Sequence, residues 1–178
     1  PVCERFWGKL PFEKATAAFH YQKESHMQLL MESFKYKSNR QLAFYLGSYA
    51  GMQLGKQDFF EQIDLILPVP LHKNKERRRG YNQSELIARG LAHCSGLPVD
   101  TGSLGRAVEN PTQTRRSIWE RSRNVQQIFR LNSSEKLAGK HVLLVDDVLT
   151  SGSTMEACGN ALLEARRLRL SFFALALA

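Results

Sequence analysis

The sequence of 178 residues is poor in cysteine and has no long apolar run. Its three cysteines, Cys3, Cys94 and Cys158, form no CxxC pair and no even set, so a disulfide framework is not expected. This favours a reducing cytoplasm. No apolar run approaches the roughly 20 residues that a membrane helix needs, and no signal peptide is visible. We therefore expect a cytoplasmic protein without membrane insertion.

Metal-ligand patterns and acidic residues are also scarce. The five histidines show no ligand spacing, so no metal site made by protein side chains alone is predicted. The 17 acidic residues are outnumbered by 25 basic ones, which gives a net charge of +8 and a pI of about 9.6. A basic protein suits anionic ligands, and charge alone leaves open whether these are phosphorylated metabolites or nucleic acid. The length is that of one α/β domain.

One stretch, HVLLVDDVLTSGST from His141 to Thr154, carries the clearest chemical signal. Its four apolar residues, 142–145, predict a buried parallel strand that ends at Asp146 and Asp147. Two adjacent carboxylates at the carboxyl end of a strand can accept hydrogen bonds from vicinal hydroxyl groups, as of a ribose. A helical pattern follows from Met155 to Arg167. We therefore expect a sugar-binding acidic pair at this strand end.

The residues between strand and helix, 150–154, predict an anion site. Gly152 lets the backbone approach a ligand, and hydroxyl groups and loop N–H groups form a nest for a phosphate. The helix that begins near Ser153 adds the positive end of its dipole. An ordinary capped helix start would explain the hydroxyl groups, since Ser and Thr are common N-caps. It would not explain the two acids, so we favour a phosphorylated pentose as the ligand.

Strand and helix patterns alternate along the chain, which predicts a mostly parallel sheet with helices on both faces. Ligands of such sheets gather outside the carboxyl ends of the strands, so residues 70–82 should lie beside Asp146. Residues 16–21 are interpreted either as a strand or as an extended arm. The predicted strands are Ile63–Val69, Leu104–Ala107, Gln127–Leu131, Val142–Val145 and Ser171–Leu177, and the predicted helices are Met27–Phe34, Asn39–Gly55, Ser84–Cys94 and Met155–Arg167.

A basic segment, LHKNKERRRGYNQ, follows the predicted strand Ile63–Val69. An isolated charge run is usually a solvated surface. This run lies at a strand's carboxyl end, where a diphosphate needs countercharge and bidentate donors. A turn and two amides follow it, which solvation does not require, so we favour a diphosphate site.

These motifs carry a family resemblance. Residues 142–154, VLLVDDVLTSGST, resemble the 5-phosphoribosyl-1-pyrophosphate (PRPP) signature of type I phosphoribosyltransferases at all thirteen positions. The segments PVPLHKNKERRRGYNQSELIA and NPTQTRRSIWERSRNVQQIF resemble the ComF/GntX branch of that family, which is associated with DNA uptake and includes proteins named competence protein ComFC. The resemblance, which is also to amidophosphoribosyltransferases, covers essentially the whole chain.

The resemblance implies a three-layer fold in which a flexible loop between the second and third core strands closes over PRPP. It implies a catalytic role for Asp146 and Asp147, and binding of the PRPP 5′-phosphate by Thr150, Ser151, Gly152, Ser153 and Thr154. Pyrophosphate binding falls to Leu71, His72, Lys73, Arg77, Arg78 and Arg79. The flexible loop contributes Gln113, Arg115, Arg116, Arg121 and Asn124. Mg²⁺ is expected to arrive with PRPP, with no direct protein ligand assigned.

The predicted organisation is an N-terminal hood over residues 1–60 and a phosphoribosyltransferase core over residues 61–178. Hood aromatics, Phe6, Trp7, Phe19 and Tyr21, either stack on a base or pack in the protein, and packing is favoured. Many family members begin with a zinc-finger-like module of four cysteines. Only Cys3 is present here, so we expect such a module to precede Pro1.

The expected reaction is transfer of phosphoribose from PRPP to an unidentified acceptor, with a role in DNA uptake. The alternative is a non-catalytic PRPP sensor or a module that associates with single-stranded nucleic acid, because the basic loops suit nucleic-acid phosphates. A P-loop NTPase is excluded, since the chain has no GxxxxGK[ST] motif. Single-stranded DNA, DNA-uptake proteins and a second copy of the chain remain open as partners.

Overall fold

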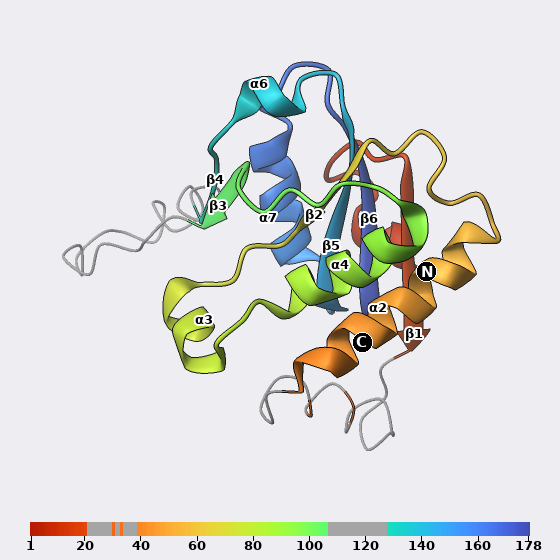
Figure 1. Ribbon diagram of the computed structural model, residues 1–178. Coiled ribbons are helices and arrows are strands. Elements are labelled where there is room, and N and C mark those ends of the chain that lie inside the picture. Colours follow the sequence, from red (N-terminus) through yellow and green to blue (C-terminus); the bar gives the residue numbers. More distant parts are fainter. Residues whose placement is uncertain (21–29, 31–32, 34–38, 107–127) are drawn as a thin grey trace.

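The computed structural model describes residues 1–20, 30, 33, 39–106 and 128–178. A four-stranded, all-parallel sheet lies at its centre, in the order β1-β6-β5-β2 (Figure 1). These strands are β1 (Lys14–His20), β2 (Leu65–Pro68), β5 (His141–Leu149) and β6 (Arg169–Leu177). The prediction of a mostly parallel sheet is confirmed, and residues 14–20 form an edge strand instead of an extended arm.

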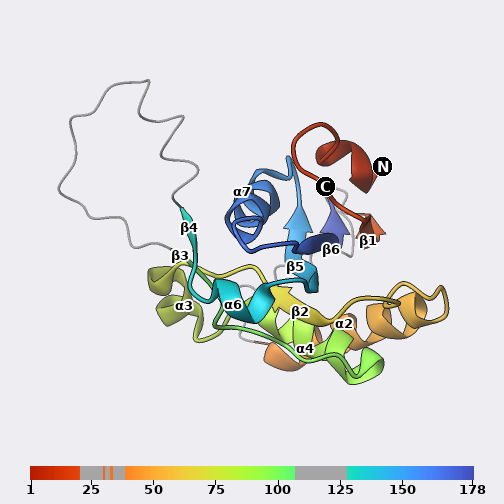
Figure 2. The ribbon, with the colours of Figure 1, turned by 90° about the horizontal axis from the view of Figure 1, so that it is seen from above.

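Helices cover both faces of this sheet (Figure 2). One face carries α2 (Arg40–Gly55) and α4 (Gln83–Ser95), and the other carries α7 (Ser153–Leu162). The short 3₁₀ helix η1 (Val2–Arg5) lies on the same side as α7. The three-layer prediction is therefore confirmed. None of the helices within the described residues is long and apolar enough to cross a membrane.

Two short strands pair outside the central sheet. β3 (Leu104–Arg106) and β4 (Phe129–Leu131) form an antiparallel ladder with each other, and α6 (Ser134–Leu137) follows. Residues 107–127, which contain the predicted flexible loop, fall between β3 and β4 in the sequence and outside the described residues. In the sequence these residues also fall between β2 and β5, the second and third strands of the parallel sheet, as predicted, and the two strands that flank them form a separate hairpin. The predicted helix at 27–34 also lies outside the described residues, except for residues 30 and 33.

The two faces of β5 and β6 make two cores because side chains alternate along a strand. Leu144 and Phe172 are fully buried in the cluster that includes α7. Leu143 and Phe173 are fully buried in the cluster that includes α2 and α4. This double burial explains why both strands are almost continuously apolar, as the sequence pattern predicts.

Two predicted boundaries differ from the structure. β5 does not end at the acids but stays paired with β6 as far as Leu149, because β6 continues beside it to Leu177. α7 ends at Leu162, five residues before the predicted end. The chain then turns toward the start of β6 with Arg167 in the left-handed region at φ +55°. A helix that reached Arg167 would leave no room for this turn.

The contact between α2 and α4 depends on glycine. A Cβ at Gly47 would collide with the backbone carbonyl of Ile87, and one at Gly90 would collide with the carbonyl of Phe44. A Cβ at Gly51 would lie 3.1 Å from the Cβ of Cys94. The two helix backbones are therefore in direct contact, and a side chain larger than hydrogen at Gly47 or Gly90 would force them apart.

We predict that Gly47→Ala lowers the free energy of unfolding by about 2 kcal/mol, since the added methyl group overpacks a backbone contact. The measurement is urea denaturation followed by circular dichroism. Gly55→Ala is the matched control in the same helix, because nothing lies within 4 Å of its added Cβ. Equal stability of the two variants would contradict this account of the helix pair.

Candidate functional site

Asp146 and Asp147 are half-buried in the carboxyl-terminal part of β5. Each carboxylate accepts a hydrogen bond from the next backbone N–H: Asp147 N donates to Asp146 Oδ1 at 2.9 Å, and Val148 N donates to Asp147 Oδ1 at 2.8 Å. Because the strand remains paired through this region, the backbone of both acids is held by the sheet. The acidic pair is thus more rigid than residues of a free loop would be.

The anion loop follows directly and leads into α7. Thr150 and Ser151 are exposed, Gly152 is buried, and Ser153 is the first residue of the helix. The hydroxyl groups of Ser151 and Ser153 lie 3.0 Å apart. Gly152 occupies the N-cap position with φ +85° and brings no side chain to it. The N–H groups of the first turn of an α-helix have no partner within the helix, so they suit an anion.

Residues of η1 support this loop from the amino-terminal side of the chain. A Cβ on Gly152 would lie 3.3 Å from Arg5 Cβ and 3.4 Å from Phe6 Cε1. Phe6 is fully buried and stacks on Phe172 with ring centroids 4.3 Å apart. The conformation of the loop is therefore supported by packing against the start of the chain.

The basic segment is helical where a loop was expected. Lys73–Arg79 forms the short helix α3, with His72 as N-cap through its Nδ1 and Gly80 as C-cap at φ +77°. Leu71 and His72 are half-buried. Lys73, Arg77 and Arg78 are exposed, whereas Arg79 is half-buried and donates to Gln83 Oε1 at 3.0 Å. Because these residues lie on different sides of the helix, Arg79 points toward the protein, whereas Arg77 and Arg78 face solvent.

Two contacts tie this segment to α2. Arg40 donates to the carbonyl of Gly80 at 2.8 Å, and its guanidinium lies over the Tyr81 ring at 5.1 Å. Burial raises the pKa of the Tyr81 hydroxyl, although the charges of Arg40 and Arg79 oppose the shift. The first turn of α2 therefore supports the end of the basic helix.

The residues after the basic helix connect it to the acidic strand. Asn82 Nδ2 donates to the carbonyl of Val69, just past the end of β2, at 3.0 Å. Ser84 Oγ donates to Asp146 Oδ1 at 2.9 Å. These contacts bring the carboxyl ends of β2 and β5 together with the start of α4. Sequence reasoning missed Ser84, because a serine in the first turn of a helix is ordinarily interpreted as a capping residue.

Arg106, at the end of β3, was also missed. Its guanidinium lies 5.4 Å from the centroid of the Phe129 ring. Burial and the negative charge of Asp146 raise the pKa of the Cys158 thiol well above its ordinary value, while Arg106 opposes the shift. Asp146 and Arg106 are thus both close enough to the same buried thiol to act on its charge. The only signal in the sequence was a basic residue at the end of a predicted strand.

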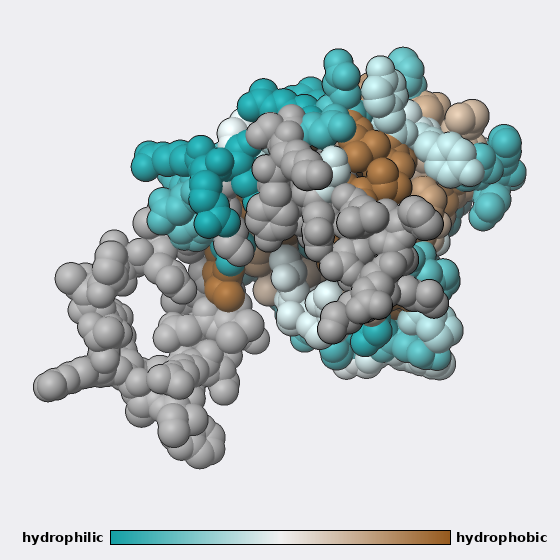
Figure 3. Space-filling model, turned by 90° about the horizontal axis from the view of Figure 1, so that it is seen from below, coloured by the Kyte–Doolittle hydropathy of each residue, from teal (hydrophilic) through white to brown (hydrophobic). Residues whose placement is uncertain are grey.

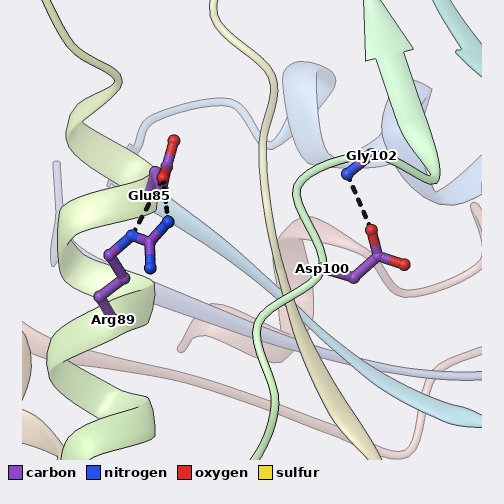
Figure 4. A network of polar contacts seen from close by, with 4 residues as sticks. All are labelled: Glu85, Arg89, Asp100 and Gly102. Carbon is purple, nitrogen blue, oxygen red and sulfur yellow. Dashed lines mark hydrogen bonds and ion pairs between the residues drawn. The ribbon is translucent and has the colours of Figure 1, made fainter.

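The approach to β3 is anchored by Asp100 (Figure 4). Its Oδ1 accepts from Gly102 N at 2.8 Å and from Ser103 N at 2.9 Å, and its Oδ2 accepts from the Ser103 hydroxyl. Burial alone would raise the pKa of Asp100, but these hydrogen bonds outweigh it and lower the pKa. These hydrogen bonds fix the base of the β3–β4 hairpin. Figure 4 also shows the ion pair of Glu85 and Arg89 on α4, whose charged atoms lie 2.7 Å apart.

The structure leaves the predicted roles of the flexible-loop residues and of the hood aromatics largely untested. Gln113, Arg115, Arg116, Arg121 and Asn124 lie outside the described residues, as does Tyr21. Phe6 is fully buried in the core, in agreement with the favoured packing role. Phe19 is half-buried, and its ring centroid lies 6.2 Å from that of Tyr49. Trp7 is 79% exposed. The hood boundary at residue 60 and a base-binding role for these aromatics stay predictions.

The fold and the site define a class of protein: an α/β protein with a parallel sheet, one of whose central strands carries an acidic pair at its carboxyl end and is followed by a glycine-bearing loop and a helix. Comparison with known proteins makes this specific. Residues 77–176, more than half of the chain, match the phosphoribosyl transferase domain. The chain belongs to the phosphoribosyl transferase domain family.

The names of the relatives refer to DNA utilization and to competence. The DNA utilization protein YhgH of Salmonella typhi is 39% identical over 100 residues, which are 56% of this chain and 43% of that protein. Competence protein F of Haemophilus influenzae is 31% identical over 135 residues, 72% of this chain and 58% of that protein. The chain thus spans less than half the length of the first of these relatives.

Solved structures agree on the fold. A glutamine PRPP amidotransferase of B. subtilis, complexed with ADP and GMP, superposes with a TM-score of 0.57 over 82% of this chain and 30% of that chain, at 20% identity. This likeness shows the fold alone. The predicted type I phosphoribosyltransferase fold and the resemblance to competence proteins are confirmed.

We predict that Gly152→Ala weakens binding of inorganic phosphate or ribose 5-phosphate at least tenfold in calorimetric titration. A side chain in the left-handed region costs about 1–2 kcal/mol, and the methyl group would also press on Arg5 and Phe6. Gly139→Ala is the control, because Gly139 also has a positive φ, +70°, but nothing within 4 Å of an added Cβ. Equal affinities in the two variants would count against the loop as the phosphate site.

Proposed function

We propose that the chain binds PRPP with Mg²⁺ and transfers the phosphoribosyl group to an acceptor, releasing pyrophosphate. The observation that carries the proposal is the acidic pair on β5, followed at once by the glycine-bearing loop and the start of α7. In this assignment the carboxylates of Asp146 and Asp147 accept hydrogen bonds from the ribose hydroxyls, and residues 150–154 bind the 5′-phosphate. The spacing along one strand and one turn then suits a single phosphorylated pentose.

The diphosphate would lie on the side of β2 and α3. Leu71, His72 and Lys73 follow the end of β2 and offer backbone and side-chain donors. The Arg79 guanidinium is turned toward the protein, and we assign it to the leaving group ahead of Arg77 and Arg78, which face solvent. Cations placed here stabilise the charge that develops as the C1–O bond breaks.

Within the described residues, no group of three or more His, Cys, Asp or Glu side chains is placed so that it could hold a metal ion. Two half-buried carboxylates fit an ion that is held mainly by the oxygens of its substrate, as Mg²⁺ commonly is. Asp146 and Asp147 would be its protein contacts, directly or through water. When bound, Mg²⁺ neutralises diphosphate charge. The protein's own part is to orient the ribose and to supply hydrogen-bond donors to the departing pyrophosphate. The pyrophosphate leaves with the electron pair of the broken C1–O bond, while the acceptor forms a bond to C1 and loses a proton.

We predict that the wild-type chain binds PRPP in the presence of Mg²⁺ and that Asp146→Asn/Asp147→Asn abolishes detectable binding, because the ribose hydroxyls lose two charged acceptors. The measurement is calorimetric titration. Glu135→Gln/Glu164→Gln removes the same charge from two exposed positions and should bind as wild type. A folded wild-type chain that binds no PRPP would overturn the proposal, and binding would justify a screen of acceptors for pyrophosphate release.

A second function, contact with single-stranded nucleic acid, is favoured by one observation. Arg77 and Arg78 are adjacent, exposed and on the outer side of α3, where they are free of the contact that turns Arg79 inward. Exposed cations of this kind bind phosphate backbones without sequence preference. The names of the relatives refer to competence and DNA utilization, and we extend that association to this chain.

We predict that the wild-type chain binds a single-stranded oligonucleotide, and that Arg77→Ala/Arg78→Ala lowers the salt slope of log K by about 1.4, since each lost phosphate contact on a single strand contributes about 0.7. Fluorescence anisotropy at several salt concentrations measures this. Lys136→Ala/Arg166→Ala, two exposed cations near the amino ends of β5 and β6, is the control. An unchanged slope in the Arg77/Arg78 variant would rule out α3 as the contact.

A further inference from the structure

Ser84 makes a contact that its place in the helix does not require. It is the second residue of α4, and its side chain is 5% exposed. Its backbone N–H is already bonded to Asn82 Oδ1, at 3.1 Å, so the helix start is capped by Asn82. The Ser84 hydroxyl points elsewhere, to Asp146 Oδ1 on β5, 62 residues away in the sequence. The Ser84 hydroxyl is therefore bonded to the acidic pair and is not needed to cap the helix.

The position of Ser84 is itself fixed. Asn82 caps α4 with its side-chain oxygen and donates its amide to the carbonyl of Val69 at 3.0 Å. Gln83 is 2% exposed and accepts from Arg79. The segment Asn82–Ser84 thus joins three parts of the site: the end of β2, the basic helix α3 and the acid on β5.

Asp146 Oδ1 receives two donors from different directions. Asp147 N lies 2.9 Å away within the strand, and Ser84 Oγ lies 2.9 Å away from the neighbouring helix. Two donors on one carboxylate oxygen define the plane of the group, because rotation about the Cβ–Cγ bond would break at least one of them. The Ser84 hydroxyl is therefore one of the groups that set the orientation of this carboxylate.

We propose that Ser84 is a positioning residue for Asp146, which holds the carboxylate in the orientation that binds the hydroxyl groups of PRPP. The inference rests on the proposed function, because it names what orients the acid of that same site. Ser84 acts through Asp146: its single O–H is donated to the carboxylate, so the orientation of the acid is set before the ligand arrives. A preoriented acceptor avoids the ordering cost that a rotating one incurs on binding.

Calorimetric titration of PRPP with Mg²⁺ into Ser84→Ala, Ser84→Cys and Ser84→Thr tests this. We expect about tenfold weaker binding for Ser84→Ala, the loss of one hydrogen bond to a charged group, and a value within about threefold of wild type for Ser84→Thr, which keeps the hydroxyl. Ser84→Cys has a side chain of similar size but a much weaker donor, so its affinity for PRPP should be close to that of Ser84→Ala. It replaces Ser84→Ala in the comparison if alanine destabilises the fold. Ser95→Ala, in the last residue of the same helix, should bind as wild type.

A double-mutant cycle separates positioning from a general effect on the fold. In an Asp146→Ala background, which removes the oxygen that Ser84 contacts, Ser84→Ala should weaken PRPP binding no further, whereas in an Asp147→Asn background the tenfold loss should persist. Wild-type affinity in Ser84→Ala, or an equal additional loss in both backgrounds, would overturn the inference while the proposed function stands. A wild-type chain that binds no PRPP would overturn both. Equal melting temperatures of Ser84→Thr and wild type confirm that the comparison reports on binding.

Discussion

The pairing of β5 with β6 is the constraint on which the rest of the structure depends. It runs from His141 to Leu149, past the point at which the apolar residues end. Because the ladder continues through the acids, Asp146 and Asp147 have a backbone held by the central sheet, with α7 and its anion loop directly attached. Without this extension the acids would lie on a loop, and their position relative to residues 150–154 would not be fixed by the sheet.

Contacts between segments distant in sequence complete the site. Asn82 and Ser84 join the start of α4 to the ends of β2 and β5, and the glycines of α2 and α4 allow those two helices to touch. Arg5 and Phe6 press against Gly152 from the start of the chain. The site is therefore a product of the whole fold: the sheet supplies the acids, and the helices set the orientation of the groups around them.

Much of this was predictable from local sequence. Runs such as Val142–Val145 predict strands because β-branched and apolar residues suit a sheet that is buried on both faces. The order of strand, acids, glycine-bearing loop and helix predicted a phosphosugar site, and Asn39 and Gly55 marked the limits of α2 within one residue. The basic segment was wrongly expected to be a loop: residues 73–79 form α3, in keeping with the high helix propensity of Lys, Glu and Arg.

Local sequence is enough to predict the parallel sheet, most of the strands and helices and the residue types at the site, because periodicity, turn residues and charge act over a few neighbouring positions. Only the packing of distant segments brings Ser84 to Asp146 and turns Arg79 inward while Arg77 faces solvent. These outcomes depend on how helices and strands from different parts of the chain pack, and no local pattern encodes a contact across 62 residues.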